Sequence, residues 1–413
     1  MSEKRVVVTG IGALCAFGRD WQTIKEKFRQ GKNAVVYLPQ LEEWSELEAK
    51  LAAPLPSYEA PKHWSRKQLR SMGLVAQYAV DCAEQCLQDA GILDNKTELK
   101  KCQNGELGVA AGSSIGSTPD IMDCGMLLAH QKNNFNANTY IRIMPHTIAA
   151  NIAIFFGLTG RIIPTSSACT SGSQAIGYSY EAIKYGKIPM MLAGGAEQLC
   201  PSEIFVFDKL FAASRKNNQP ETTPRPYDVE RDGLVIGEGA CMLLLEELEH
   251  AKARGAKIYA EIVGYGANCD GTHITRPNKD TMQKCMKLAL QDAKIPASEI
   301  AYINAHGTAT EYGDIAESQA AAELFGYKPM SCQKSYFGHT LGACGSLEAF
   351  FSIEMMRDEQ FVPNINLENI DPRCGEVDYL LQERNISAEF VISNNFAFGG
   401  VNTSLVLKRW VNN

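Results

Sequence analysis

Three side chains capable of nucleophilic and acid–base chemistry are the starting point: Cys169, His306 and His339. A cysteine thiolate attacks a carbonyl carbon and also departs from it readily, so it suits the transfer of an acyl group. Imidazole rings donate hydrogen bonds or accept protons near neutral pH. The chain has 13 cysteines and seven histidines, so only the surrounding sequence can single out these three.

The segment around Cys169 indicates a strand, a loop and then a helix. "RIIP" has strand composition, "TSSA" is small and polar, and Ile176, Tyr180 and Ile183 follow at helical spacing. Cys169 is therefore expected at a helix N-terminus, where unpaired amides and the helix dipole lower the pKa of a thiol. The same amides could hold an oxyanion. The alternative is a buried cysteine in a tight strand-to-helix turn.

The two histidines lie in similar glycine-rich loops. "NAHGTAT" places His306 in a loop after a predicted strand, and "KSYFGHTLGACG" places His339 just before a predicted helix. A single loop histidine is more often structural or exposed than catalytic. Two of them, in loops equivalent to that of Cys169, favour a shared site.

The equivalence rests on an internal repeat. "EQCLQDAGI" and "KLALQDAKI" end helical patterns in the two halves, and "ACTSGSQA" matches "GACGSLEA" with the Gly-Ser pairs in register. "RVVVTGIG" and "IYAEIVGYG" open the halves alike. We interpret residues 1–252, with the cysteine, and 253–413, with the two histidines, as copies of one unit. Alternating strands and helices predict a layered α/β fold with mixed sheets.

Composition narrows the possible functions. The chain is 45% hydrophobic and 21% charged, with a net charge of −7 and no long basic run, so it can bury a large core and nucleic acid is not an expected partner. No apolar run is long enough for a secretory signal or a membrane span. The scattered, odd-numbered cysteines predict reduced thiols and a cytoplasmic protein. Cys82 and Cys86 are interpreted as buried small side chains, and no metal site is expected.

The opening "VVVTGIGALC" begins like a dinucleotide-binding motif. Gly10 and Gly12 follow a strand, but Cys15 stands where a third glycine is needed and no acidic residue follows a strand at the required distance. We interpret these glycines as a tight turn at the end of the strand.

The motifs "ACTSG", "NAHGTAT", "GHTLGA" and "NNFAFGGVN", in this order over nearly the whole chain, resemble the β-ketoacyl-acyl carrier protein synthases. The likeness is closest to the elongating synthase II type. The resemblance implies the thiolase-like fold, five layers α-β-α-β-α built from two pseudo-symmetric halves.

The resemblance also implies a reaction. Cys169 takes an acyl chain as a thioester, malonyl-acyl carrier protein loses CO₂, and the carbanion attacks that thioester. His306 and His339, as neutral donors, stabilise the enolate. The backbone amides of Cys169 and Phe398 hold the oxyanion, and Phe398 and Gly399 belong to a gating loop.

Further positions follow from the same resemblance. Lys334 and Glu317 are expected to form a buried network that positions the histidines, which differs little from a structural salt bridge. Other matching residues have roles in binding: Thr275, Thr308 and Thr310 along the phosphopantetheine tunnel, Ile115 at the acyl pocket, and Lys67 and Arg70 toward an acidic carrier protein. Ile115 as plain core, and Lys67 and Arg70 as a solvated helix face, remain alternatives.

Several residues depart from the family pattern. Ala397 stands for a glycine of the gating loop, Cys344 for an alanine, and Arg142 and His146 for apolar or small residues. These changes leave the acyl substrate open. The alternative function is a condensing ketosynthase of a specialised polyketide or aryl polyene pathway, alone or paired with a chain-length-factor-like subunit. A chain-length partner itself typically lacks the cysteine. We expect a homodimer that requires no cofactor beyond the phosphopantetheine borne by the carrier protein.

Overall fold

The computed structural model describes residues 3–144 and 146–411. Within these residues, eleven strands form one mixed sheet in the order β13-β11-β10-β15-β16-β9-β1-β8-β6-β4-β5. Their bounds are β1 (Val6–Leu14), β4 (Leu107–Gly112), β5 (Ile162–Pro164), β6 (Met190–Glu197), β8 (Gly239–Glu247), β9 (Ala260–Cys269), β10 (Ile300–Asn304), β11 (Pro329–Ser331), β13 (Asp378–Tyr379), β15 (Phe390–Phe396) and β16 (Val401–Arg409). A small three-stranded sheet consists of β2 (Val36–Tyr37), β3 (Leu51–Ala53) and β7 (Ile236–Gly237). A two-stranded sheet consists of β12 (Gln360–Phe361) and β14 (Arg384–Asn385).

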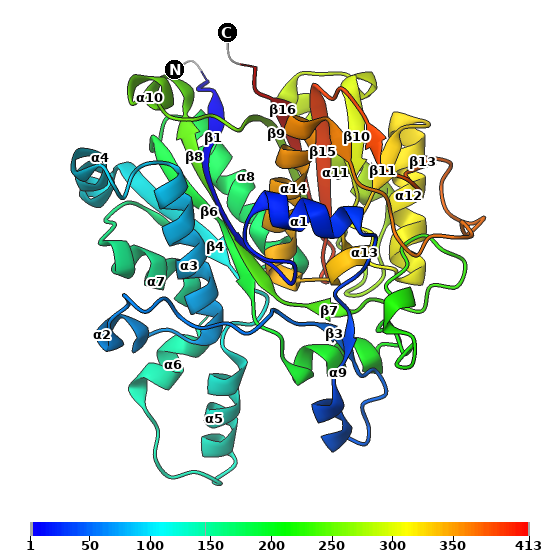
Figure 1. Cartoon of the computed structure of the whole chain (residues 1–413), viewed down its shortest axis with the longest axis horizontal. Coiled ribbons are helices and arrows are strands. Elements are labelled where there is room, and N and C mark those ends of the chain that lie inside the picture. Colours follow the sequence, from blue (N-terminus) through cyan, green and yellow to red (C-terminus); the bar gives the residue numbers. More distant parts are fainter. Residues whose placement is uncertain (1–2, 145, 412–413) are drawn as a thin grey trace.

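Helices cover the strands on every face. They are α1 (Trp21–Arg29), α2 (Arg66–Leu69), α3 (Leu74–Asp89), α4 (Lys96–Lys101), α5 (Thr118–Leu128), α6 (Ala137–Ile143), α7 (Thr147–Phe156), α8 (Ser171–Lys184), α9 (Pro201–Lys209), α10 (Leu248–Ala253), α11 (Lys279–Ala293), α12 (Glu311–Phe325), α13 (Lys334–Phe337) and α14 (Cys344–Asp358). The central pair, α8 and α14, lies between the two halves of the sheet (Figure 1). On the outer faces, α3 and α7 pack on the first half, and α11, with α12 beside it, packs on the second. The predicted five-layered α-β-α-β-α arrangement is confirmed.

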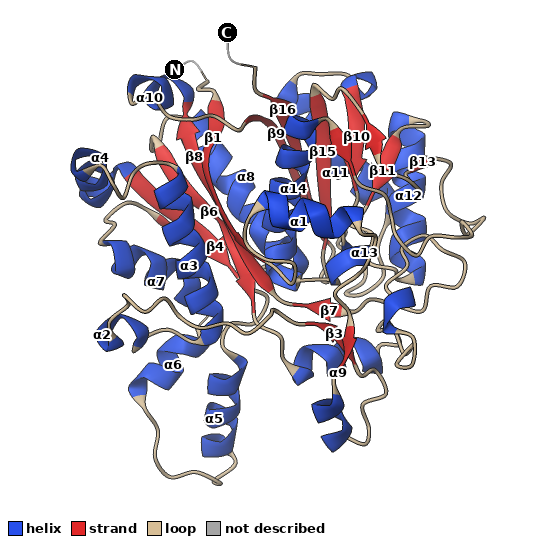
Figure 2. Ribbon diagram, in the orientation of Figure 1, coloured by secondary structure: helices blue, strands red, loops and turns tan. Residues whose placement is uncertain are grey.

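The two halves of the sheet have the same topology. Toward the centre of the sheet, the first half runs β5-β4-β6-β8-β1 and the second runs β11-β10-β15-β16-β9, with β13 added outside β11. When these five strands are numbered by their order in the sequence of each half, both halves show the same spatial order: third, second, fourth, fifth, first. Antiparallel pairing of β1 with β9 joins the halves, which then diverge around α8 and α14 (Figure 2). The duplication read from the sequence is confirmed, and α10 spans the boundary predicted at residues 252 and 253.

Glycines in the first strand of each half allow the outer helix to approach closely. Gly10 and Gly12 lie inside β1, so the prediction of a strand-end turn is wrong. A Cβ at Gly12 would lie 1.9 Å from the backbone oxygen of Cys82 on α3, and one at Gly266 in β9 would lie 2.2 Å from that of Cys285 on α11. These glycines therefore serve helix–strand packing, and Cys82 is a buried packing residue as expected.

Glycines also allow the two helices of the middle layer, α8 and α14, to approach each other closely. A Cβ at Gly172 on α8 would lie 2.9 Å from the amide nitrogen of Ser346, and one at Gly345 on α14 would lie 2.7 Å from that of Ser173. These are the two Gly-Ser pairs that the sequence places in register. Helices α8 and α14 therefore touch through their backbones near their N-terminal ends.

None of the helices in the described ranges is long and apolar enough to cross a bilayer.

Candidate active site

Cys169 lies where the sequence predicts it, at the start of a helix. It occupies a 3₁₀ turn, Ala168–Thr170, that leads directly into α8. Ala168 has a φ of +52°, a conformation that costs an L-residue energy and that the surrounding structure must enforce. The Cys169 side chain is 5% exposed and faces the space between the two halves of the fold.

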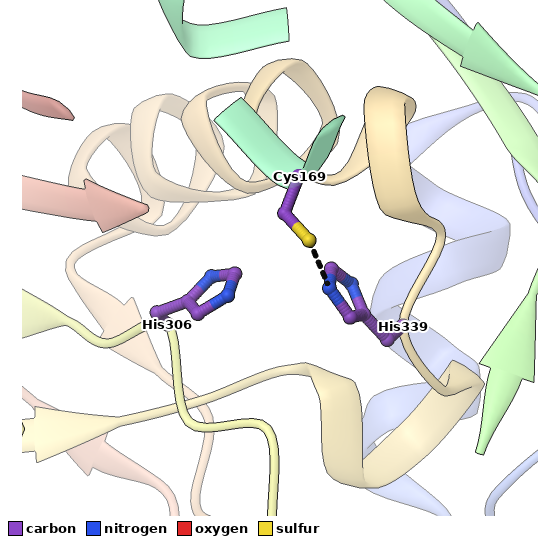
Figure 3. Close-up of side chains that lie close together, drawn as sticks. All are labelled: Cys169, His306 and His339. Carbon is purple, nitrogen blue, oxygen red and sulfur yellow. Dashed lines mark hydrogen bonds between the residues drawn. The ribbon is translucent and has the colours of Figure 1, made fainter. Parts of the chain in front are cut away.

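The Cys169 sulfur contacts one histidine and two backbone amides. His339 Nε2 is 3.1 Å from Sγ, and Figure 3 shows the His339 ring edge directed at the sulfur. The backbone amides of Phe398 and Cys169 also donate toward this sulfur and act to lower its pKa. Two N–H groups thus converge beside the Cys169 sulfur, which is the arrangement that an oxyanion hole requires.

The pKa of Cys169 is nevertheless high, which corrects the expectation from helix position. Burial raises it to about 12 and outweighs the lowering by Lys334 and by the two amides. The resting group is therefore a thiol. Its proton must leave during attack, and His339 Nε2 is the acceptor within reach.

Both histidines are neutral, as the sequence-based reading requires. The His306 and His339 rings are nearly perpendicular, at 86°, with centroids 5.2 Å apart. Burial and then the nearby Lys334 ammonium hold the pKa of each histidine well below its ordinary value. At neutral pH each ring carries one proton and can donate a single hydrogen bond.

Glu317 holds the loop that carries His306. Its carboxylate accepts hydrogen bonds from the amides of His306, at 2.7 Å, and Gly307, at 2.8 Å, and from the Tyr227 hydroxyl at 3.1 Å. Burial raises its pKa to about 7 against the opposing effect of those amides. Glu317 therefore acts on the backbone of the loop and does not contact the imidazole.

Lys334 pairs with a carboxylate that the sequence analysis did not select. Its ammonium forms a buried ion pair with Glu348 on α14 and lies 3.3 Å from His306 Nδ1. Burial disfavours the charged lysine, but the Glu348 carboxylate outweighs it and raises the pKa of Lys334. Glu348 in turn accepts from Asn395 Nδ2 at 2.7 Å. The available signal was a single glutamate in the otherwise uncharged start of α14, "CGSLEAFF".

Glu197 is a second carboxylate that sequence reasoning missed. It ends β6 and accepts hydrogen bonds from the amides of Ser114, at 2.8 Å, and Gly342, at 2.9 Å. Burial raises its pKa to about 7. Glu197 thereby joins the loop after β4 to the turn that follows His339.

A cavity of about 530 Å³ leads to Cys169. Its lining contains Cys169, His306 and His339, together with Glu317. It also contains most of the residues that the resemblance assigns to the pantetheine arm and the gating loop, namely Thr275, Thr308, Thr310 and Phe398. The hydroxyls of Thr308 and Thr310 lie 2.9 Å apart. The structure therefore gathers these positions from five separate segments.

The loop around Phe398 and Gly399 is tied to the loop that carries Thr275. Gly399 adopts a φ of +82° and donates its amide to Ile274 O at 2.8 Å. The backbone amide of Asp270 donates to the Gly400 carbonyl oxygen at 2.9 Å. The Phe398 ring stacks against Phe207, with centroids 5.0 Å apart. The two loops that frame the cavity are thus hydrogen-bonded to each other.

Three predicted binding residues lie away from this cavity. Ile115 follows β4 and is 39% exposed, so it is not plain core in the single chain. Lys67 lies in α2, Arg70 caps it, and both are exposed. None of these three residues belongs to the described lining of the cavity.

The site contains ligand types that bind transition metals. One atom each from Cys169, His306 and His339 lies within 4.8 Å of the others, and His306, Cys344 and Glu348 form a second such set. A ligating imidazole usually donates its other N–H to an acceptor. His306 Nδ1 instead faces the Lys334 ammonium, a donor, which disfavours a metal at its Nε2.

Two family models match successive parts of the chain. The "Beta-ketoacyl synthase, N-terminal domain" family matches residues 3–251, and the "Beta-ketoacyl synthase, C-terminal domain" family matches residues 259–368. A "3-oxoacyl-[acyl-carrier-protein] synthase 2" of Vibrio harveyi is 36% identical over 423 aligned residues, which cover 99% of each chain.

Solved structures give the same result. A beta-ketoacyl synthase from Burkholderia phymatum STM815 is 52% identical, with a TM-score of 0.96 over 99% of this chain and 100% of the other. A type II PKS ketosynthase, solved in complex with its acyl-carrier protein and bound to the hexaketide, is represented by a chain 29% identical to this one. Its TM-score is 0.86 over 99% and 100% of the two chains.

The resting thiol predicts a pH dependence for alkylation of Cys169. Because its pKa is raised to about 12, the thiolate fraction should keep increasing through the neutral and mildly alkaline range. Iodoacetamide labelling, followed by peptide mass spectrometry, should therefore accelerate continuously from about pH 6 to about pH 10. A rate that reaches a plateau below about pH 8 would instead indicate a thiolate–imidazolium pair with His339.

Proposed function

The chain belongs to the beta-ketoacyl synthase family, and we propose that it catalyses the decarboxylative Claisen condensation of an acyl chain with malonyl-acyl carrier protein. The acyl chain is held as a thioester on Cys169, and the product is 3-oxoacyl-acyl carrier protein. One observation carries the proposal: a buried thiol 3.1 Å from a neutral imidazole, with a second neutral imidazole opposite, in one cavity.

The first half-reaction is acyl transfer. The Cys169 thiol attacks the carbonyl carbon of the acyl thioester while its proton passes to His339 Nε2. The amides of Cys169 and Phe398 receive the negative charge that develops on the carbonyl oxygen. The pantetheine sulfur then departs and takes the proton, which leaves the acyl group on Cys169 and both histidines neutral.

The second half-reaction forms the carbon–carbon bond. When the malonyl group loses CO₂, the electron pair moves into the thioester and negative charge collects on its oxygen. The neutral rings of His306 and His339 line the same cavity, with centroids 5.2 Å apart, and donate hydrogen bonds that stabilise this enolate. The carbanion attacks the acyl thioester, and Cys169 leaves as a thiolate that regains a proton.

The supporting residues have separate tasks in this proposal. Glu317 fixes the backbone around His306, and Lys334 with Glu348 fixes the imidazole from behind. The three threonines that line the cavity, Thr275, Thr308 and Thr310, contact the pantetheine arm. Phe398 and Gly399 open and close the passage to the acyl pocket, which Ile115 limits in length.

Fatty acid elongation is the proposed setting. The curated relative is named for 3-oxoacyl-acyl carrier protein synthesis and covers the full chain, which favours elongation of plain acyl chains. The second candidate is a specialised ketosynthase, alone or paired with a chain-length-factor-like subunit. It is favoured by the likeness to the hexaketide-bound ketosynthase and by the departures at Ala397 and Arg142. The thirteen cysteines, all within the described ranges and all free thiols, support a cytoplasmic location.

Acyl transfer from a panel of carrier proteins tests the function. Intact-protein mass spectrometry of the wild type should show one acyl adduct, and Cys169→Ala should show none. The acyl group that loads fastest among saturated, unsaturated and aryl-polyene donors decides between the two settings. An equal adduct on Cys169→Ala would contradict the nucleophile assignment.

The histidine variants separate the two half-reactions. His306→Ala should lose condensation and malonyl decarboxylation by about 100-fold or more, since it removes a donor to the enolate, and should retain more of the acyl transfer. His339→Ala should impair both steps. Unchanged malonyl decarboxylation in both variants would refute their proposed role.

We propose that the exposed basic residues of α2, Lys67 and Arg70, receive the acidic carrier protein. Opposite charges steer such encounters and accelerate association at low salt. The double variant Lys67→Glu/Arg70→Glu should raise the KM for the carrier substrate about tenfold with little change in kcat. The matched double variant Lys96→Glu/Lys100→Glu on α4 should leave KM unchanged. Equal effects of both double variants would argue against a docking role for α2.

A homodimer is proposed from the free edge of the sheet. Strand β5 ends the sheet, and the apolar side chains of Ile154 on α7 and Ile162 on β5 are 73% and 44% exposed in the single chain. Sedimentation should give twice the 45.3 kDa protomer mass. Ile154→Glu should release protomers, whereas Tyr327→Glu, at a side chain 74% exposed in the other half, should not. A wild type that sediments as a protomer would favour a required second subunit.

A further inference from the structure

The ring nitrogen Nδ1 of His306 faces two buried groups. Lys334 Nζ is 3.3 Å from it, and Asn395 Nδ2 is 3.4 Å from it. His306 is 6% exposed, Lys334 1% and Asn395 0%, so water has little access to this contact. Lys334 begins α13, whereas Asn395 lies on β15. Only the folded chain brings these two residues together at the His306 ring.

Glu348 determines which way the Asn395 amide points. Its Oε2 accepts from Asn395 Nδ2 at 2.7 Å, and its Oε1 is paired with the Lys334 ammonium. A carboxylate paired with an ammonium accepts hydrogen bonds and does not donate them. Rotation of the amide would put Asn395 Oδ1 against that carboxylate, so the NH₂ group must face both Glu348 and His306.

Both neighbours of His306 Nδ1 are therefore donors. An ammonium and an amide NH₂ offer protons only, and a proton on Nδ1 would oppose both of them. Since His306 is neutral, its single proton must lie on Nε2. Nε2 is at the other edge of the ring, and the ring points toward the space between Cys169 and His339 (Figure 3).

His339 lacks an equivalent constraint. Its Nδ1 has no hydrogen-bond partner among the residues that the structure describes, and its Nε2 lies beside the Cys169 sulfur. Its proton can therefore be on either nitrogen, as a group that first accepts a proton and later donates one requires. The two histidines thus differ in the groups behind them.

We propose that Asn395 is a positioning residue that, with Lys334, fixes His306 as the tautomer protonated on Nε2. This makes His306 a permanent donor to the thioester oxygen and leaves proton transfer with Cys169 to His339. The tautomer follows from the contacts around a neutral ring, while its use in catalysis rests on the proposed function. Asn395 does not contact the reacting atoms and acts only through the imidazole.

Asn395→Asp tests the proposal with little change in shape, because it replaces the NH₂ donor by an oxygen. Asn394→Asp is the matched control. Asn394 is also buried on β15, on the alternate face, and its Oδ1 accepts from Ser404 Oγ at 2.8 Å. If the aspartate prevents folding, Asn395→Leu removes the donor without adding a carboxyl group.

The first readout does not depend on activity. Nitrogen NMR of the protein labelled with ¹⁵N-histidine, with His306 assigned by loss of its signals in His306→Gln, should show a protonated Nε2 and an unprotonated Nδ1 in the wild type. Asn395→Asp should shift the proton toward Nδ1, and Asn394→Asp should not. A wild-type His306 protonated on Nδ1 overturns the proposal, whatever the enzyme catalyses.

The second readout links the tautomer to the reaction. Malonyl decarboxylation should fall by at least ~10-fold in Asn395→Asp, while acylation of Cys169 should change much less. Asn395→Leu should fall in the same direction, and Asn394→Asp should behave as the wild type. Equal loss of both half-reactions would indicate a merely structural role for Asn395. A wild type that decarboxylates no malonyl donor would refute the proposed function and leave the NMR result to decide the tautomer.

Discussion

The contact between α8 and α14 is the constraint on which the active site depends. Cys169 begins the first helix and His339 precedes the second, so the separation of these helices sets the distance between sulfur and imidazole. Gly172 and Gly345 remove the side chains that would hold the helices apart. The 3.1 Å contact between the halves follows from backbone-to-backbone packing that only glycine permits at these two positions.

Burial then decides the protonation states in the site. It raises the pKa of the Cys169 thiol and lowers those of both histidines, so the resting site holds a thiol and two neutral rings. Lys334 keeps its charge in the same environment because Glu348 pairs with it. The buried Lys334–Glu348 ion pair thus lies behind the neutral thiol and imidazole rings. It orients His306, and the Lys334 ammonium adds to the effects that keep the rings of His306 and His339 neutral.

Much of the architecture could be predicted from local patterns, and the candidate catalytic residues could be selected from them. The repeated phrases predicted two copies of one unit, and strand-to-helix spacing placed Cys169 at the start of a helix. Gly10 and Gly12 were wrongly assigned to a turn, because whether a glycine ends a strand or admits a helix depends on the helix that packs there. The expected lowering of the Cys169 pKa was also wrong, since helix position is local and burial is not.

The sequence by itself determined the chemistry available: one cysteine and two histidines in matching loops, with the motifs of a condensing enzyme around them. Only the tertiary structure decided how that chemistry is arranged. It paired Lys334 with Glu348, assigned Glu317 to the backbone of the His306 loop, and brought Asn395 from β15 to the imidazole. Pairings between such distant segments have no local signal, because they depend on how the two halves of the sheet close around α8 and α14.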